Sequence, residues 1–230
     1  MRTGANRRLT VAVCFVALSA AYFLVGRRLD TGGAILFKVL PEVLLSAVLC
    51  SSAKRSSDPA GLRLAFAALL FSIAGDAFGE FKSGFWGDHA FVLQVAFFAV
   101  AQVLYAISFA RFVPFGKVGA PRLLFAALLA AYFVAMAVVL LGSIHEPVFK
   151  VAVLVYLCLL ALMSITAVLQ RREGYPCFVT GALLFVISDS MIAVGMFLRT
   201  FPHRGLLIML SYFAAQLLLN IKLIKPYNHD

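Results

Sequence analysis

The sequence predicts an all-α, polytopic membrane protein with eight transmembrane helices. Of its 230 residues, 63% are hydrophobic and only 13% are charged. A soluble domain is nearer half apolar and about 25% charged, so a soluble domain of this length would lack the polar surface that it needs. The third observation is that the apolar residues are grouped into eight long runs separated by short polar connections.

Each run approaches the ~20 residues that a helix needs to cross the hydrocarbon core of a bilayer. Barrel strands would alternate apolar and polar residues, which these runs do not, and an open sheet would leave backbone groups unpaired in lipid. We therefore expect a single integral membrane domain over residues 1–230. The predicted spans are residues 9–25, 33–50, 62–79, 91–110, 121–141, 148–169, 177–198 and 205–223.

The ends of the runs carry recognisable signals. The first run follows Arg7 and Arg8, a pattern shared with signal peptides, and residues 19–21 form a candidate cleavage region. The run is long for a signal peptide and leads directly into Arg27, which favours a retained span. The second and third runs lie near the short limit for a span. Proline, which is expected where helices begin or end, marks the edges of later runs: Pro59, Pro121, Pro147 and Pro202.

The distribution of Lys and Arg predicts that both termini are cytoplasmic, because cytoplasmic loops carry an excess of these residues. One side has thirteen: Arg2, Arg7, Arg8, Lys54, Arg55, Arg63, Arg111, Lys117, Arg122, Arg171, Arg172, Lys222 and Lys225. The other side has five: Arg27, Arg28, Lys82, Arg199 and Arg204. The expected location is a bacterial inner membrane or, in a eukaryotic cell, an ER-type membrane.

The composition excludes several classes of protein. The net charge of +10 arises from basic residues that are scattered between apolar runs, so no nucleic-acid partner is expected. The low charge content also excludes a soluble globular enzyme and a disordered tail. Four isolated cysteines form no CxxC pair and are interpreted as small apolar side chains: Cys14, Cys50, Cys158 and Cys177.

A faint internal repeat suggests two parallel four-helix halves. Residues 69–73 precede Asp76 in the third span, and the similar residues 183–187 precede Asp189 in the seventh. A Gln follows each Asp in the next span, after 26 residues at Gln102 and after 27 at Gln216. Such repeats often place a site at their interface, although apolar helices also share letters by chance.

Polar side chains within the spans are the candidate site residues, because a charge at bilayer depth costs ~3 kcal/mol even on a mild scale. Lys38 and Glu42 are four residues apart and share a helix face, so they are able to pair. Asp76 and Asp189 are the acidic residues that a structural role explains least well. The remaining candidates are polar residues of the third, fourth and eighth spans: Glu80, Gln94, Gln102, Tyr105, Tyr212 and Gln216.

Counting along the spans places Lys38, Asp76 and Tyr212 within about two turns of the non-cytoplasmic end. Glu42, Asp189 and Gln216 lie deeper, near the middle of their spans, so all of these residues are expected to line one cavity that opens away from the cytoplasm. Burial there would keep one carboxylic acid protonated near neutral pH, as acid/base chemistry requires. Simpler interpretations remain open: a neutralised Lys–Glu pair, Glu80 capping its helix at headgroup level, and glutamines that only join helices.

Three histidines fall in predicted loops on the non-cytoplasmic side: His89, His145 and His203. Three His with an Asp would be able to hold a catalytic zinc ion, as in some seven-span lipid amidases. No two of these histidines are helically spaced, however, and loop histidines are common at membrane interfaces. We therefore expect neither a metal nor an organic cofactor.

Four motifs stand in a characteristic order along the chain: residues 38–41 (KVLP), 71–76 (FSIAGD), 187–190 (ISDS) and 212–216 (YFAAQ). In that order, and on these spans, they resemble the signature of the lysoplasmalogenase-like family of eight-span integral membrane hydrolases. Each motif alone is weak, but the ordered set covers nearly the whole chain. One departure concerns the fourth span, where relatives often carry a His one turn before a Tyr and this chain has Gln102 before Tyr105.

The resemblance implies hydrolysis of the vinyl ether bond of a lysoplasmalogen in the bilayer. The products would be a fatty aldehyde and a glycerophospho-ethanolamine or -choline. Asp76 and Asp189 would be the essential acidic pair, and two carboxylates in different environments suit this chemistry. Substrate-binding roles fall to Lys38, Glu42, Gln102, Tyr105, Tyr212 and Gln216. The alternative is a multi-span lipid or small-molecule transporter or binding protein that uses the same polar cavity.

Overall fold

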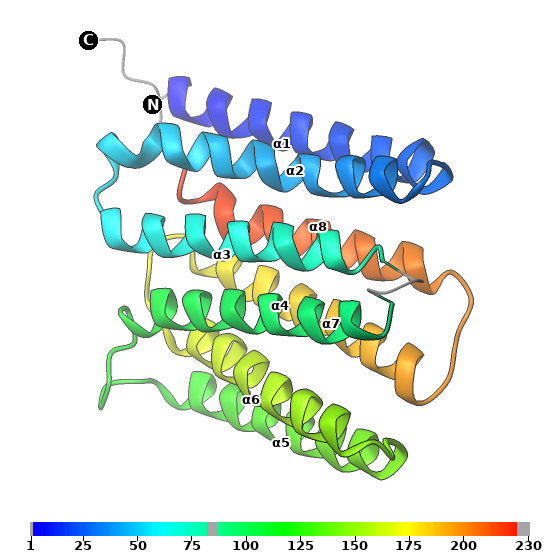
Figure 1. Ribbon diagram of the computed structural model, residues 1–230. Coiled ribbons are helices and arrows are strands. Elements are labelled where there is room, and N and C mark those ends of the chain that lie inside the picture. The colour runs from blue at the N-terminus through cyan, green and yellow to red at the C-terminus, as the bar shows by residue number, and fades with distance from the viewer. Residues whose placement is uncertain (1, 82–86, 225–230) are drawn as a thin grey trace. The chain divides into compact units, whose positions relative to one another are not determined.

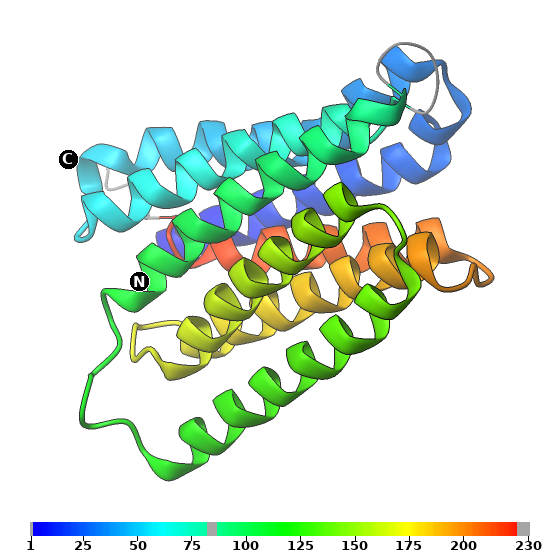
Figure 2. The ribbon, with the colours of Figure 1, turned by 60° about the horizontal axis from the view of Figure 1, so that its bottom comes forward.

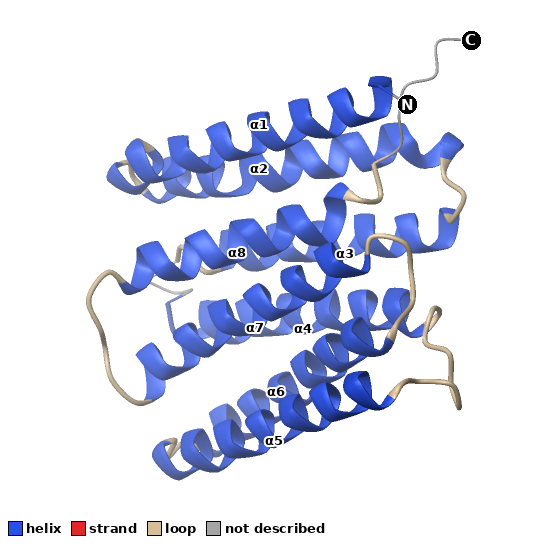
Figure 3. Ribbon diagram, turned by 180° about the vertical axis from the view of Figure 1, so that it is seen from behind, coloured by secondary structure: helices blue, strands red, loops and turns tan. Residues whose placement is uncertain are grey.

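The structure is a computed structural model that describes residues 2–81 and 87–224. Within these residues, eight helices are long and apolar enough to cross a membrane, and no strand occurs (Figure 3). The predicted eight-helix membrane fold is therefore confirmed. The helices are α1 (Arg2–Leu24), α2 (Thr31–Ser52), α3 (Pro59–Phe78), α4 (Gly87–Ala110), α5 (Ala120–Ser143), α6 (Pro147–Leu169), α7 (Tyr175–Phe197) and α8 (Arg204–Ile221).

Local sequence explains where the helices begin. The Asp30 side chain accepts a hydrogen bond from the Gly33 backbone N–H and caps α2, and Asp58 does the same for Gly61 at the start of α3. Pro59, Pro121, Pro147 and Pro176 occupy the first turns of α3, α5, α6 and α7, where a missing N–H costs nothing. The sequence placed most helix ends within a few residues, and α1 begins earlier than expected.

The chain divides into two compact units, residues 1–101 with 216–230, and residues 102–215. The division falls inside α4 and α8 rather than between helices. It therefore does not coincide with two sequential four-helix halves, and the four-plus-four repeat stays a prediction. In the first unit, α1 packs against α2 and α2 against α3, which are seen side by side in Figure 1. In the second unit, α6 packs between α5 and α7 (Figure 2).

Contacts of two arginines place the beginning of α1 and the end of α8 at one end of the first unit. Arg7 donates hydrogen bonds to the hydroxyls of Ser51 and Ser52, at the end of α2. Arg8 donates to the backbone carbonyl of Ile224, just beyond α8, at 3.0 Å. The beginning of α1 and the end of α8 therefore lie at the same end, as an even number of spans requires. Of the basic residues in the charge comparison, Lys82 and Lys225 lie outside the described residues.

We expect that end to be cytoplasmic, because the charge bias of thirteen to five favours it. A reporter that functions only in the cytoplasm, fused after Asp230, should therefore be active. The same reporter fused within the loop at His145 is the matched control and should be silent. An inactive but well-expressed C-terminal fusion, with an active loop fusion, would reverse the orientation.

Candidate functional site

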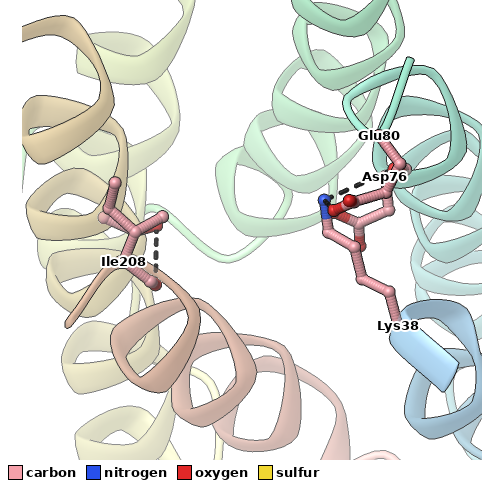
Figure 4. A network of polar contacts seen from close by, with 5 residues as sticks. Lys38, Asp76, Glu80 and Ile208 are labelled. Atoms are coloured by element: carbon pink, nitrogen blue, oxygen red, sulfur yellow. Dashed lines mark hydrogen bonds and ion pairs between the residues drawn. The ribbon is translucent and has the colours of Figure 1, made fainter. Parts of the chain in front are cut away.

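A buried ion-pair network joins α2 to α3 in the first unit. The Lys38 ammonium lies 3.2 Å from an Asp76 carboxylate oxygen and 3.0 Å from a Glu80 carboxylate oxygen (Figure 4). It also lies 3.4 Å from the backbone carbonyl of Asp76, to which it donates a hydrogen bond. Lys38 is 5% exposed and Asp76 is 2% exposed. One buried ammonium group therefore forms ion pairs with two carboxylates.

This network changes the interpretation of two predicted residues. Helical spacing allowed Lys38 to pair with Glu42 on its own helix, but the ion pairs found at Lys38 are with Asp76 and Glu80 of the neighbouring segment. Glu80 was expected at headgroup level as a cap. It lies just beyond the end of α3 and folds back toward Lys38 instead, because an ion pair offsets the cost of the buried ammonium. Glu42 is completely buried.

Small residues bring α4 close to the Asp76 segment. A side chain at Gly75 would meet the Phe98 ring at about 3 Å, and one at Gly79 would meet the Gln94 amide at 2.5 Å. Glycine at these positions leaves room for the Phe98 and Gln94 side chains against the α3 backbone, as small residues do at helix interfaces in membranes. The Phe78 and Phe97 rings stack beside this contact at 5.4 Å between centroids. The carboxylate of Asp76 is thus carried on a closely packed helix end.

Asp189 in the second unit has a different environment. The Tyr156 hydroxyl of α6 donates a short hydrogen bond to Oδ2 of Asp189, at 2.5 Å. Gln102 is completely buried, and no hydrogen bond is found for either of its side-chain amide atoms among the described residues. Asp189 is 9% exposed. A phenol O–H thus donates a hydrogen bond to this carboxyl group.

Residues on either side of Asp189 fix the position of α7. The Ser188 hydroxyl donates to the backbone carbonyl of Ile208 in α8 at 3.2 Å, the contact drawn at Ile208 in Figure 4. The hydroxyls of Tyr132 and Ser190 are hydrogen-bonded at 2.6 Å, which ties α7 to α5. Asp189 is therefore held between two anchored neighbours, so its carboxyl group has a defined orientation.

The other predicted site residues are buried within their units. Tyr105 is 1% exposed and stacks against Phe109 within α4. Tyr212 contacts Phe185 edge to face, with 5.5 Å between centroids. Gln216 is completely buried, and its backbone carbonyl accepts a hydrogen bond from the Asn220 side chain. The structure thus brings Lys38 together with Asp76 and Glu80, and Tyr156 together with Asp189.

Two tyrosines that the sequence analysis did not single out belong to these environments. Tyr156 contacts Asp189, and Tyr22 of α1 lies in electrostatic range of Lys38, Asp76 and Glu80. Both lie inside apolar runs, where a tyrosine is an ordinary helix residue. A search for aromatic hydroxyls in the spans would have identified them as candidates but would not have assigned their partners.

The three histidines considered for a zinc site lie near the ends of different helices or in the loops between them. His89 opens α4, His145 lies between α5 and α6, and His203 precedes α8 with a positive φ of 56°. Within residues 2–81 and 87–224, no group of three His, Cys, Asp or Glu side chains is arranged to hold a metal ion.

The chain resembles known proteins over most of its length. Residues 33–223 match the YhhN family. The chain is 32% identical to lysoplasmalogenase TMEM86A of Bos taurus over 177 residues, which cover 74% of this chain and 68% of that protein. It is 30% identical to lysoplasmalogenase TMEM86A of Homo sapiens over 184 residues, 75% of this chain and 71% of that protein.

A further human relative, lysoplasmalogenase TMEM86B, is 32% identical over 195 residues, which cover 84% of this chain and 76% of that protein. No solved structure matches the chain. The family match and the three relatives agree with the motifs identified in the sequence. The chain therefore belongs to the YhhN, lysoplasmalogenase-like family.

Proposed function

We propose that this protein is a membrane-embedded hydrolase that cleaves the vinyl ether bond of lysoplasmalogens. The products are a fatty aldehyde and a glycerophospho-ethanolamine or -choline. The observation that carries the proposal is the presence of two carboxyl groups inside transmembrane helices in contrasting environments, Asp76 beside a lysine and Asp189 beside a tyrosine. The names of the curated relatives support the same activity.

The reaction needs a proton donor and a stabilising negative charge. A vinyl ether is hydrolysed when a proton adds to its β-carbon, which leaves an oxocarbenium ion on the ether carbon. Water then adds to that carbon and loses a proton, and the resulting hemiacetal separates into the alcohol and the aldehyde. One carboxylic acid supplies the first proton, and a carboxylate stabilises the cation and accepts the proton from water, as in glycoside hydrolysis.

The two environments favour different roles for the two aspartates. The ammonium of Lys38 stabilises the carboxylate form of Asp76, which suits the group that faces the oxocarbenium ion. Asp189 is the proposed acid. After it gives up its proton, the Tyr156 hydrogen bond becomes charge-assisted and therefore stronger, so Tyr156 stabilises the transition state more than the ground state.

Binding of the lysolipid is assigned to the remaining buried polar residues. We propose that Glu42, Gln102, Tyr105, Tyr212 and Gln216 bind and orient the substrate. Lys38 contributes to binding through its charge on the substrate phosphate. Gln102 offers an amide where relatives often carry a His, and an amide retains hydrogen-bonding capacity.

A comparison of three lysolipids tests the proposed function. Detergent-purified protein is incubated with a vinyl-ether lysolipid, with its saturated alkyl-ether analogue and with the acyl lysolipid of the same headgroup. Aldehyde should form from the vinyl ether alone, because only that substrate yields an oxocarbenium ion on protonation. Fatty acid release from the acyl lysolipid, without aldehyde from the vinyl ether, would instead indicate an esterase.

Removal of the Tyr156 hydroxyl should slow turnover without weakening binding. We expect Tyr156→Phe to lower kcat about tenfold, since a hydrogen bond to a charged group contributes ~1.5–3 kcal/mol, and to leave KM unchanged. Tyr175→Phe is the matched control, because its hydroxyl donates to the backbone carbonyl of Val168 rather than to Asp189. A raised KM with unchanged kcat would mean that Tyr156 binds the substrate and does not assist the proton donor Asp189.

Turnover should also survive removal of metal ions. The proposed acid and base are carboxyl groups within the helices, and the three histidines lie at helix ends or in loops. Alanine at His89, His145 and His203, singly, should leave substantial aldehyde release, and so should treatment with chelators. Loss of turnover on chelation that zinc restores would make a ceramidase-like zinc mechanism the better account.

A further inference from the structure

A stripe of buried polar side chains runs along the contact between α2 and α3. Lys38, Glu42 and Ser46 follow one another at four-residue intervals on α2, and therefore share one face of that helix. Ser72, Asp76 and Glu80 follow at the same interval on α3 and the residues just beyond it. Lys38, Glu42, Ser46, Ser72 and Asp76 are all buried.

The ion pairs of Lys38 join the two rows at one end. α2 packs against α3, and the short connection between them makes the two helices antiparallel. The Lys38–Asp76 ion pair fixes the register of the contact at 3.2 Å. Four residues further along each helix, a rise of about 6 Å, we expect Glu42 at the level of Ser72. We call these five residues, Lys38, Glu42, Ser46, Ser72 and Asp76, the polar seam.

Two serines in the seam have hydroxyls without partners. Among the described residues, no hydrogen bond is found for Oγ of Ser46 or Oγ of Ser72, although they are 6% and 0% exposed. Serines in helices commonly donate to a backbone carbonyl three or four residues earlier. Ser52, Ser190 and Ser211 do so in this chain. A hydroxyl left unpaired in a membrane interior is costly, and in native proteins a bound water usually satisfies such a group.

We propose that the polar seam binds water molecules and supplies them to the carboxylate of Asp76. A water molecule accepts from a serine O–H and donates to a carboxylate, so it satisfies both kinds of group in the seam. A metal cation would take only lone pairs and would leave the serine donors unpaired. In the proposed function, on which the supply role rests, water is the second substrate and is consumed at bilayer depth, where none is otherwise present.

X-ray radiolytic labelling detects such water directly, because irradiation of a bound water produces hydroxyl radicals that oxidise only its immediate neighbours. Leu45 and Leu69 are completely buried and lie next to Ser46 and one turn from Ser72, so they serve as reporters. Leu140 of α5 is equally buried and is the control. We expect labelling of Leu45 and Leu69 but not of Leu140, and loss of the labelling in the Ser46→Ala, Ser72→Ala double variant.

Absence of labelling at both reporters in the wild-type protein would overturn the proposal. A melting temperature that rises with sodium relative to choline, with the rise abolished in the double variant, would assign a sodium ion to the seam and would also overturn it. The same double variant should lower kcat for aldehyde release while KM stays unchanged, because capture of the oxocarbenium ion without the bound water becomes slow enough to limit turnover. Unchanged kcat would overturn the supply role.

The labelling result does not depend on turnover. Labelled reporters in a protein that releases no aldehyde would support the bound water and contradict the proposed function. Aldehyde release without labelled reporters would support the proposed function and contradict the binding of water in the polar seam.

Discussion

Replacement of Asp189 or Asp76 by Asn is expected to lower the turnover of lysoplasmalogen by at least ~100-fold, the lower range for loss of a general acid or base. Asparagine keeps the size and most of the hydrogen bonding of aspartate but carries no charge and transfers no proton. Asp189→Asn removes the proposed proton donor, and Asp76→Asn removes the charge that stabilises the oxocarbenium ion. Aldehyde release at saturating substrate, with matched expression and monodispersity in detergent, measures both effects.

The variant with both substitutions tests whether Asp76 and Asp189 act together in one reaction or independently of each other. Groups that act as a unit are not additive, so Asp76→Asn with Asp189→Asn should be little slower than the slower single variant. Asp30→Asn is the matched control, because Asn caps a helix as well as Asp and Asp30 lies outside the proposed site. Turnover near that of the wild type in either single variant would remove that aspartate from the mechanism.

Replacement of Lys38 by Met is expected to be the most destabilising single change in the first unit. It removes the cation that Asp76 and Glu80 share, and leaves two carboxyl groups buried without it. Breaking a buried ion pair by removing one partner typically costs about 3–5 kcal/mol. Unfolding in detergent should therefore shift to a markedly lower denaturant concentration or temperature. Lys150→Met, at an exposed position of α6, is the control and should have little effect.

Neutralisation of Asp76 and Glu80 should restore much of the stability that Lys38→Met removes. The triple variant Lys38→Met, Asp76→Asn, Glu80→Gln carries no buried charge at the network and should regain most of the stability, although not the activity. A Lys38→Met protein of wild-type stability with a raised KM would mean that Lys38 binds the substrate phosphate and does not hold the two carboxylates.

The number of spans was predictable from the sequence because each helix must be continuously apolar over the thickness of the bilayer. The candidate carboxyl groups were predictable for the converse reason, since Asp76 and Asp189 stand out as costly residues in apolar runs. The family was predictable from the order of four short motifs. These inferences use only properties that are local in the sequence.

Side-chain contacts between different helices were harder to predict from the sequence. Helical spacing suggested Glu42 as the ion-pair partner of Lys38. The ammonium group on the long Lys38 side chain instead reaches the neighbouring segment, where Asp76 and Glu80 lie. Tyr156 was missed because its role depends on the rotation of α6 against α7, which no spacing within either helix specifies. The unpartnered hydroxyls of Ser46 and Ser72 are likewise a property of packing rather than of sequence.

The most direct measurement of the central claim is aldehyde formation by the purified protein in proteoliposomes that contain a lysoplasmalogen, with transfer of the lysolipid between leaflets followed in the same sample. If the protein is a hydrolase, one aldehyde should appear for each glycerophospho-base released, and Asp189→Asn should abolish both products. Transfer of intact lysolipid between leaflets without aldehyde, unaffected by Asp189→Asn, would contradict the account and identify a transporter instead.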